Sequence, residues 1–318
     1  MPAVNSKIIQ ADYNNVRNKI VAVLGNGSGN SGYGQQARIN SVAVAEGTKI
    51  TINEWANLRF DIINAYKHIN GVNPTTAQVA EGNTVRYTSS FTPDTGTLDV
   101  PQNQYDVWAD NITTNRFGIA GGESATTTAV SQSRTGSWST QCSCTVTFSF
   151  PTTDEARYFF NSGGQIRVSA SRSGGVTSNQ NTAWASLLSS AGTQGLGGAV
   201  PSTGTTPNDG TNWYKTTNAF QTFYTATSSS PYGSNTYRLQ ARCVDVPSNS
   251  GGTAASGEIR VLFTDGYTDP GPPAPGDDID GTLTVSASTL FATGIMVPGS
   301  TVFTVTGPII VVGAVTGS

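Results

Sequence analysis

The sequence predicts a mainly β protein with a small α-helical N-terminal region, an antiparallel β-sheet or sandwich core containing one strand–helix–strand unit, and a small C-terminal β segment. Three observations predict this class. Short runs of alternating polar and apolar residues recur after residue 140, which is typical of half-buried strands. Apolar residues at helical spacing are concentrated before residue 75. Charged residues are only 12% of the 318 residues, against roughly 25% in ordinary globular chains, and this composition is common in β-rich extracellular and virion proteins.

Changes in composition divide the chain into four parts. We expect a two-helix attachment region at residues 1–74 and a β-rich central domain at residues 75–268. A Pro-rich linker follows at residues 269–280, and a β segment at residues 281–318. The run DPGPPAPGDD is the clearest boundary, because closely spaced prolines favour an extended, semi-rigid spacer.

Two amphipathic helices are expected in the first part. Residues 8–24 form the first, with Asp12 as a candidate cap. Thr51 and Glu54 have capping-box spacing for the second helix, which Gly71 ends. The apolar stripes are Tyr13, Val16, Ile20 and Val23 or Leu24 in the first helix, and Trp55, Leu58, Ile62, Tyr66 and Ile69 in the second. Two helices make a thin core, so we expect the stripes to meet another subunit or another part of this chain.

Weaker patterns surround these helices. The glycine-rich run at residues 25–36 lacks the lysine of a phosphate-binding loop and is expected to be a flexible connector. Residues 38–50 are expected to contain a short strand, and residues 105–112 a helical turn. The triplet at residues 94–96, Asp-Thr-Gly, matches the aspartic-protease signature, but a lone triplet is better explained as a turn.

The strand–helix–strand unit spans residues 142–172. Alternation places the cysteines and phenylalanines of CSCTVTFSF on one face, and a proline ends that strand. Thr152 and Glu155 have capping-box spacing for a short helix, and the glycines at 163–164 suit its end. The helix is expected to bury Ala156, Phe159 and Phe160, and the second strand Ile166, Val168 and Ala170.

Three further segments complete the predicted central domain. Residues 181–191 predict a short helix that buries Trp184, Leu187 and Leu188. Two β-rich runs surround a turn at residues 228–235, and residues 258–264 alternate again. The polar faces of the last two strands carry Arg238, Arg242 and Arg260. These arginines either lie on a solvated sheet face or pair with acidic residues of a neighbouring subunit.

The C-terminal segment, residues 281–318, is uncharged and rich in β-forming residues. Because about 40 residues rarely sustain a core of their own, we expect it to dock onto another copy or another protein, with a small self-contained sandwich as the alternative. Asp277, Asp278 and Asp280 just before it have the composition of a calcium loop. Their spacing does not match an EF-hand and no glutamate follows, so calcium binding stays open.

Charge and composition argue against several classes of function. The net charge of −3, without a cluster of lysine or arginine, argues against nucleic-acid binding. The N-terminus lacks the features of a secretory signal, and no uncharged apolar run approaches the roughly 20 residues of a membrane helix. Cys142, Cys144 and Cys243 lie on apolar strand faces, so we expect them to be buried, reduced and free of metal.

We expect no catalytic centre, no cofactor and no metal site, and therefore no enzyme. The only histidine, His68, lies near a helix C-terminus without a nucleophile motif, and we expect it to be solvated there. Asp154 and Glu155 are explained by helix capping. A pair of carboxylates brought together from distant positions for glycoside hydrolysis stays open.

Several stretches resemble a known class of protein. IIQADYNNVRNKIVAVLGNGSGNSGYGQ and INEWANLRFDIINAYKHING resemble N-terminal regions of structural proteins of contractile-tailed, cyanophage-like bacteriophages. TFSFPTTDEARYFFNSGGQIRVS and GEIRVLFTDGYTD are similar to segments of such proteins, and the likeness spans most of residues 8–268. The shared motifs are folding motifs that carry over no functional residues. The resemblance implies a virion component of the tail, baseplate, neck or fibres.

The expected function is therefore a non-enzymatic structural component of a bacteriophage virion, made in the host cytoplasm and assembled with other virion proteins. Self-assembly as a trimer, or as a six-fold or twelve-fold ring, is expected from closed symmetry. The alternatives are a capsid decoration protein and an adhesin that binds host-surface glycans. The adhesin alternative depends on the aromatic side chains Trp108, Trp138, Trp213 and Tyr214, which can stack on sugars or belong to the core.

Overall fold

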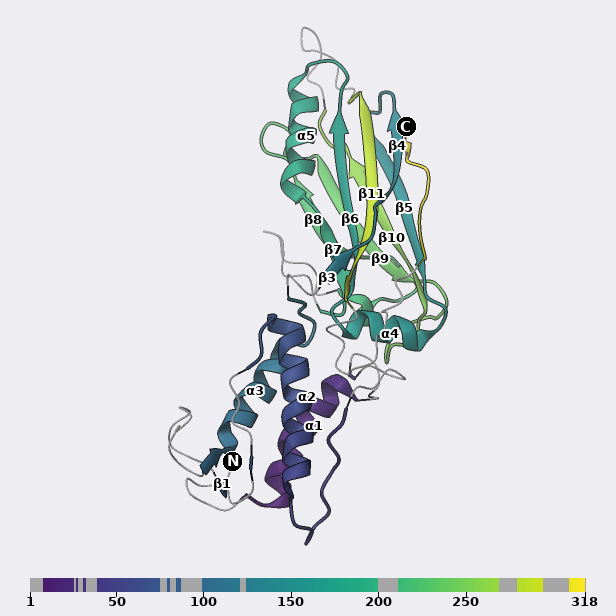
Figure 1. Cartoon of the computed structure of the whole chain (residues 1–318). Helices are drawn as coiled ribbons and strands as arrows, with labels where there is room; N and C mark the ends of the chain where they lie inside the picture. Colours follow the sequence, from purple (N-terminus) through teal and green to yellow (C-terminus); the bar gives the residue numbers. More distant parts are fainter. Residues whose placement is uncertain are drawn as a thin grey trace. The chain divides into compact units, whose positions relative to one another are not determined.

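The computed structural model describes residues 8–25, 27, 31–32, 39–74, 79–80, 84–86, 99–120, 124–199, 211–268, 279–293 and 309–317. Two compact units contain these residues (Figure 1). The helical unit comprises Met1–Ala125, Asn161–Gly163 and Ala292–Val305, and the sandwich unit comprises Thr126–Phe160, Gly164–Phe291 and Thr306–Ser318. The described residues are mainly β, with two antiparallel sheets and a small helical N-terminal region, which confirms the predicted fold class.

The described residues of the helical unit form three helices and one short parallel strand pair. Its elements are α1 (Gln10–Leu24), α2 (Ile52–Asn70), α3 (Gln102–Thr114), β1 (Thr84–Arg86) and β2 (Asp99–Pro101). The backbone N–H of Ile9 donates to Asp12 at the start of α1, at 3.0 Å. The backbone N–H of Asn53 donates to the hydroxyl of Thr51 at the start of α2, at 3.3 Å. Gly71 follows α2 with φ of 76°, a left-handed conformation that glycine adopts without strain.

The third helix supplies the core that two helices would lack. The ring of Trp55 on α2 lies 5.3 Å from that of Tyr13 on α1 and 5.2 Å from that of Tyr105 on α3. The sequence predicts only a helical turn where α3 runs for 13 residues, and Ala109 and Ile112 continue its buried stripe. The stripes of α1 and α2 therefore meet another part of the same chain, which is one of the two expected outcomes.

Residues 39–50, the described part of the predicted strand, do not form a strand, because side chains bind their backbone instead. Asp61 on α2 is fully buried and accepts the backbone N–H groups of Asn40 and Ser41 at 2.8–3.0 Å. Asn14 on α1 donates to the carbonyl oxygen of Val44 and accepts its N–H, at 2.8 and 3.0 Å. These two side chains satisfy the backbone groups that a strand would use in a ladder.

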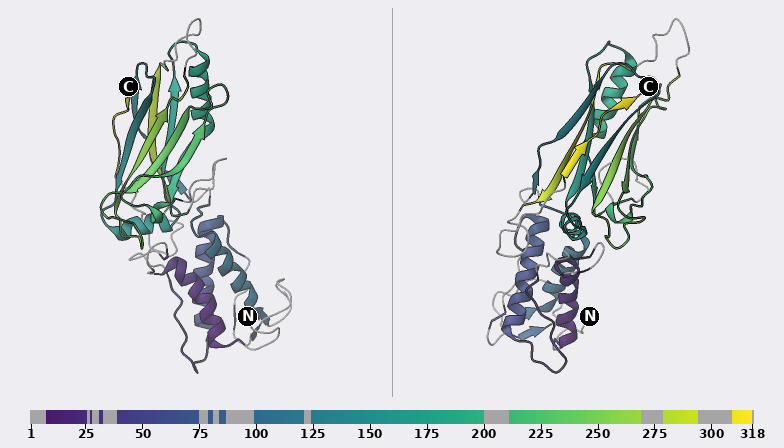
Figure 2. Two further views of the ribbon diagram at one scale, coloured as in Figure 1. Left: turned by 180° about the vertical axis from the view of Figure 1, so that it is seen from behind. Right: turned by 90° about the vertical axis from the view of Figure 1, so that its right-hand side faces the viewer.

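Two antiparallel sheets form the sandwich unit (Figure 2). The six-stranded sheet has the order β12-β5-β10-β9-β8, with β13 also paired to β5. The five-stranded sheet has the order β3-β11-β6-β7, with β4 also paired to β11. The strands are β3 (Ser124–Thr126), β4 (Val130–Thr135), β5 (Gln141–Ser149), β6 (Gln165–Ser173), β7 (Gln194–Gly197), β8 (Gln221–Thr227), β9 (Thr236–Cys243), β10 (Ser256–Thr264), β11 (Thr282–Ala292), β12 (Ile309–Val312) and β13 (Thr316–Gly317). The helical elements are α4 (Thr153–Asn161), α5 (Asn179–Ala191) and a 3-10 turn at Trp213–Lys215.

The predicted strand–helix–strand unit is confirmed, and it connects the two sheets. β5 belongs to the six-stranded sheet and β6 to the five-stranded sheet, with α4 between them. The backbone N–H of Glu155 donates to the hydroxyl of Thr152 at 3.2 Å, which is the predicted cap. The ring of Phe160 stacks on Trp213 at 4.8 Å and lies 6.5 Å from the ring of Phe148 on β5. The apolar side of α4 is thus buried, as its spacing predicts.

Other predictions for the central domain are also confirmed. α5 buries Trp184, Leu187 and Leu188. The alternating residues of β9 and β10 that were expected to face inward are all fully buried. The triplet at residues 94–96, most of the glycine-rich run at 25–36 and most of the linker at 269–280 lie outside the described residues.

The described C-terminal strands belong to the sandwich, which differs from the predicted separate segment. β11 lies inside the five-stranded sheet, between β6 and the strands β3 and β4, and buries Leu283, Val285 and Ala287. β12 and β13 pair with β5 at the edge of the other sheet. The partner strands come from far earlier in the chain, so local composition does not reveal the pairing. The uncharged residues of β11 are therefore covered by other strands of the same chain. The boundary of the β-rich domain also differs from the prediction, because the residues from 75 to Ala125 belong to the helical unit.

Candidate functional site

The three arginines singled out in the sequence share one face of the six-stranded sheet. Along β9, Tyr237 and Leu239 point into the core and are fully buried, so Arg238 and Arg242 lie on the opposite face. β10 places Arg260 on that same face, directly opposite Gln240 of β9. We call this surface the arginine face and define it by Phe220, Arg238, Gln240, Arg242, Glu258 and Arg260.

Pairing between β9 and β10 sets the contacts of the arginine face. Arg242 lies opposite Glu258, and its Nε and Nη2 both lie 2.7 Å from the same carboxylate oxygen. Arg260 donates through Nε to the amide oxygen of Gln240 at 3.0 Å, and Nη2 donates to the same oxygen. The amide nitrogen of Gln240 in turn donates to the hydroxyl of Thr222 on β8, at 3.2 Å. These contacts hold two guanidinium groups in place across three adjacent strands.

Phe220, just before β8, orders the same two guanidinium groups. The guanidinium carbon of Arg242 lies 4.5 Å from the centroid of its ring, and that of Arg260 lies 4.2 Å from it. Each contact is a cation–π interaction, worth about 0.5–1 kcal/mol at exposed sites. Neither Phe220 nor Gln240 could be assigned to this surface from sequence, because their roles depend on strand register rather than on local pattern.

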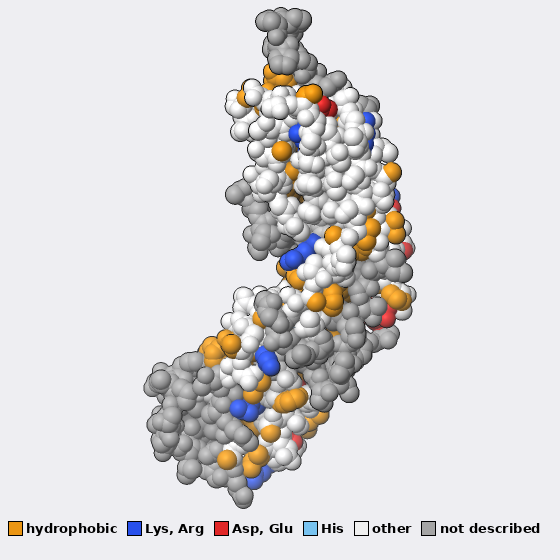
Figure 3. All heavy atoms as spheres, turned by 45° about the horizontal axis from the view of Figure 1, so that its top comes forward, with side chains coloured by type: hydrophobic (Ala, Val, Ile, Leu, Met, Phe, Trp, Pro, Cys, Tyr) orange, Lys and Arg blue, Asp and Glu red, His pale blue; other side chains and the backbone are white. Residues whose placement is uncertain are grey.

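The arginine face carries an excess of positive charge. Three arginines and one glutamate give it a net charge of +2. Among the described residues, Arg242 is the only one of the three with an acidic partner, while Arg260 is bound by a neutral amide. Elsewhere the sandwich surface seen in Figure 3 is mostly uncharged, with few blue or red side chains. The arrangement can therefore bind anionic groups, and it contains no residue set for covalent chemistry.

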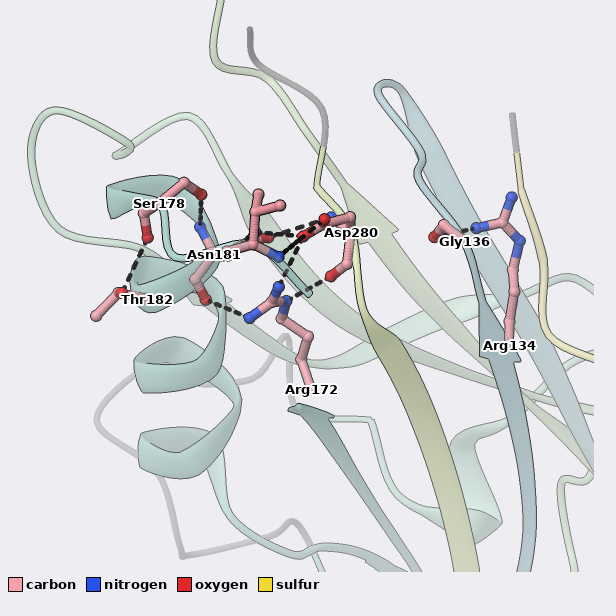
Figure 4. Close-up of polar contacts among 8 residues, drawn as sticks. Arg134, Gly136, Arg172, Ser178, Asn181, Thr182 and Asp280 are labelled. Atoms are coloured by element: carbon pink, nitrogen blue, oxygen red, sulfur yellow. Dashed lines mark hydrogen bonds and ion pairs between the residues drawn. The ribbon is translucent and has the colours of Figure 1, made fainter. Parts of the chain in front are cut away.

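Of the three acidic residues of the calcium hypothesis, the structure describes Asp280 alone. Asp277 and Asp278 lie outside the described residues. Asp280 accepts hydrogen bonds from the backbone N–H of Val176, at 3.0 and 3.2 Å to its two oxygens, and from the side-chain amide of Asn181 (Figure 4). Together with Arg172, these donors hold the pKa of the Asp280 carboxyl below its usual value. Both carboxylate oxygens of Asp280 are therefore already bound by protein groups.

Two of the four aromatic residues weighed for sugar binding belong to the core. Trp138 and Trp213 are buried, and Trp138 packs edge-on against Trp184 at 5.1 Å between ring centroids. Trp108 on α3 packs against Tyr66 on α2 at 4.8 Å and is partly exposed. Trp138 and Trp213 are therefore unavailable for stacking on a sugar, whereas Trp108 and Tyr214 are partly exposed.

The histidine and the cysteines occupy buried positions. His68 is not solvated as predicted, because it is 1% exposed and its Nε2 lies 2.9 Å from the carbonyl oxygen of Ser162 within the helical unit. Cys142, Cys144 and Cys243 are buried as free thiols, which confirms their predicted burial. Burial raises the pKa of all three thiols, that of Cys144 to about 11, so they stay protonated at neutral pH.

No group of three or more His, Cys, Asp or Glu side chains suited to a metal ion occurs in the part of the chain that the structure describes. Within the same ranges, none of the helices has the length and apolar character to cross a membrane.

Comparison with known proteins adds no relative. No protein-family model, no curated protein and no solved structure matches this chain.

Proposed function

We propose that the chain is a non-enzymatic structural component of a bacteriophage virion, from the tail, baseplate, neck or fibres, that works by binding other proteins of the particle. The observation that carries this proposal is the arginine face. It is a positively charged surface on a sheet whose other side is core, and two of its arginines have no acidic partner among the described residues. The resemblance of the sequence to structural proteins of tailed phages is the reason for proposing a phage particle as the place of assembly.

The geometry favours assembly over glycan binding. Arginine and aromatic side chains are enriched at protein–protein interfaces, where lysine and glutamate are depleted. The burial of Trp138 and Trp213 removes half of the aromatic residues on which a glycan-binding adhesin would depend. Assembly of several copies as a trimer, or as a six-fold or twelve-fold ring, remains part of this proposal.

Location in the particle tests the proposed function. Particles of the virus that encodes the chain are purified, analysed by mass spectrometry and labelled with gold-tagged antibodies against the isolated protein. We expect the chain to be present, with label at a constant position on the tail or its attachments. Absence from the particles would contradict the proposal, and label spread over the shell would assign the chain to capsid decoration.

A further inference from the structure

We propose that the arginine face binds paired carboxylates on an extended, acidic segment of a partner protein. This inference deepens the assembly function proposed above and rests on it for the partner's class, while the ligand chemistry can be tested on the isolated chain.

Positive charges gather on the arginine face without enough negative charge beside them. Arg242 and Arg260 share the ring of Phe220, and among the described residues Glu258 forms an ion pair with Arg242 and not with Arg260. Like charges held over one ring repel each other. The chain as a whole has a net charge of −3, so the excess of positive charge is local to this face. An added anion would reduce the repulsion between its arginines. Charge complementarity thus points to an anionic occupant.

Strand register gives the spacing of the two arginines that lack acidic partners. Arg238 lies opposite Leu262, while Arg260 lies opposite Gln240, so the two arginines are diagonal neighbours on adjacent antiparallel strands. Diagonal positions of this kind are about 7–8 Å apart. Acidic residues at alternate positions of an extended chain are spaced by about 6.8 Å and point to one side. An extended segment with acids at positions i and i+2 therefore fits the pair.

The ring of Phe220 favours a protein ligand over an acidic sugar. Sugars bind to aromatic side chains by stacking on an open ring, whereas two guanidinium groups already lie over this ring. The neighbouring outward positions on β5 and β8 carry the small hydroxyl residues Thr145 and Thr222, which leave the sheet open to a flat or extended partner. Carboxylates can approach the free guanidinium N–H groups without displacing the stacked arrangement.

Peptide binding to the full chain at low salt tests the proposal. The probe is an eight-residue peptide of alternating Glu and Thr, and the matched probe replaces every Glu by Gln. We expect only the acidic peptide to bind, with affinity falling as salt is added. The double variant Arg238→Gln/Arg260→Gln should weaken binding about tenfold, because it removes two exposed ion pairs with the peptide. Glu258→Gln raises the charge of the face and should strengthen binding about two- to fivefold.

A matched control is available on the other sheet. Arg167 on β6 also donates to a glutamine side chain, at 3.4 Å to Gln165, so Arg167→Gln removes one arginine charge away from the face and should leave binding unchanged. An equal loss with Arg167→Gln, or no binding of the acidic peptide, would overturn the proposal. Tighter binding of polygalacturonate than of the peptide would show that the face binds acidic glycans. It would overturn the proposal that the ligand is a protein. If the peptide binds but the chain is absent from particles, the proposed function fails and the ligand chemistry stands.

Discussion

Arg172 on β6 and Asp280, just before β11, are joined by two hydrogen bonds. Nη2 of Arg172 donates to Oδ1 of Asp280 at 3.2 Å, and Nε donates to the carbonyl oxygen of Asp280 at 2.8 Å. The residue that the sequence offered as a calcium ligand is thus an anchor between two strands of the five-stranded sheet. It holds the start of β11 at the point where that strand enters the sheet.

This anchor predicts a pH-dependent contribution to stability. Because the pKa of Asp280 is lower in the folded chain, its carboxylate stabilises the fold above the ordinary pKa of aspartate. That contribution is lost as the pH falls through the lowered value. Asp280→Asn should therefore lower the thermal midpoint of the sandwich unit at pH 7, and the difference from the unaltered chain should shrink in acid.

The control for this measurement is Glu46→Gln, which changes an exposed acid that has no hydrogen-bond partner among the described residues. It should leave the midpoint unchanged at both pH values. Equal midpoints for the unaltered chain and Asp280→Asn at pH 7 would contradict the anchor.

Deletion of residues 281–318 should unfold the sandwich unit. The deletion removes β11 from the interior of the five-stranded sheet, together with the buried Leu283 and Val285. The free energy of unfolding of a typical domain is only about 5–15 kcal/mol. We expect the loss of an internal strand to cost more than this. Circular dichroism measures the outcome, and deletion of residues 309–318, which removes only edge strands, should be milder. An unchanged β spectrum after the larger deletion would show that the described pairing of β11 is wrong.

The aromatic contact of α4 predicts a large cost for one truncation. Phe160→Ala should lower the free energy of unfolding of the sandwich unit by about 3–5 kcal/mol, because the fully buried ring packs against Trp213 and Phe148. Thr152→Ala should cost about 1 kcal/mol through loss of the helix cap. Chemical denaturation followed by tryptophan fluorescence measures both. Phe60→Ala, at a ring that is 45% exposed, should change stability by no more than about 0.5 kcal/mol.

Thiol labelling tests the state of the cysteines. Because burial raises the pKa of all three thiols, the folded chain should react slowly with a thiol reagent at pH 8. Denaturation without reductant should release three reactive thiols for each chain. Fewer than three would reveal a disulfide, and rapid labelling of the folded chain would contradict their burial.

Local patterns were sufficient for elements whose signals lie within ten or twenty residues. The capping pair Thr152 and Glu155 and the alternation of β9 predict their structures correctly. Pairing between distant strands could not be predicted, because nothing in the sequence around β11 identifies β4 or β6 as its neighbours. The same limit applies to the arginine face. Alternation identifies Arg238, Arg242 and Arg260, whereas the contacts of Phe220 depend on the register of three strands.

The burial of polar residues in the helical unit was also hard to predict. Asp61 and His68 lie on the buried side of α2, where an apolar stripe alone would place Tyr66 and Ile69. Asp61 is buried because it binds the backbone of the preceding segment, and that segment's conformation is not encoded in its own periodicity.

Arginine footprinting in assembled particles tests the central claim, that the arginine face is a protein-binding surface of a virion component. Phenylglyoxal modifies accessible arginines, and mass spectrometry compares the labelling of each arginine in the isolated chain and in intact particles. We expect Arg238 and Arg260 to be labelled in the isolated chain and protected in particles, while Arg167 on the other sheet remains reactive. Equal labelling of Arg238 and Arg260 in both states would contradict it.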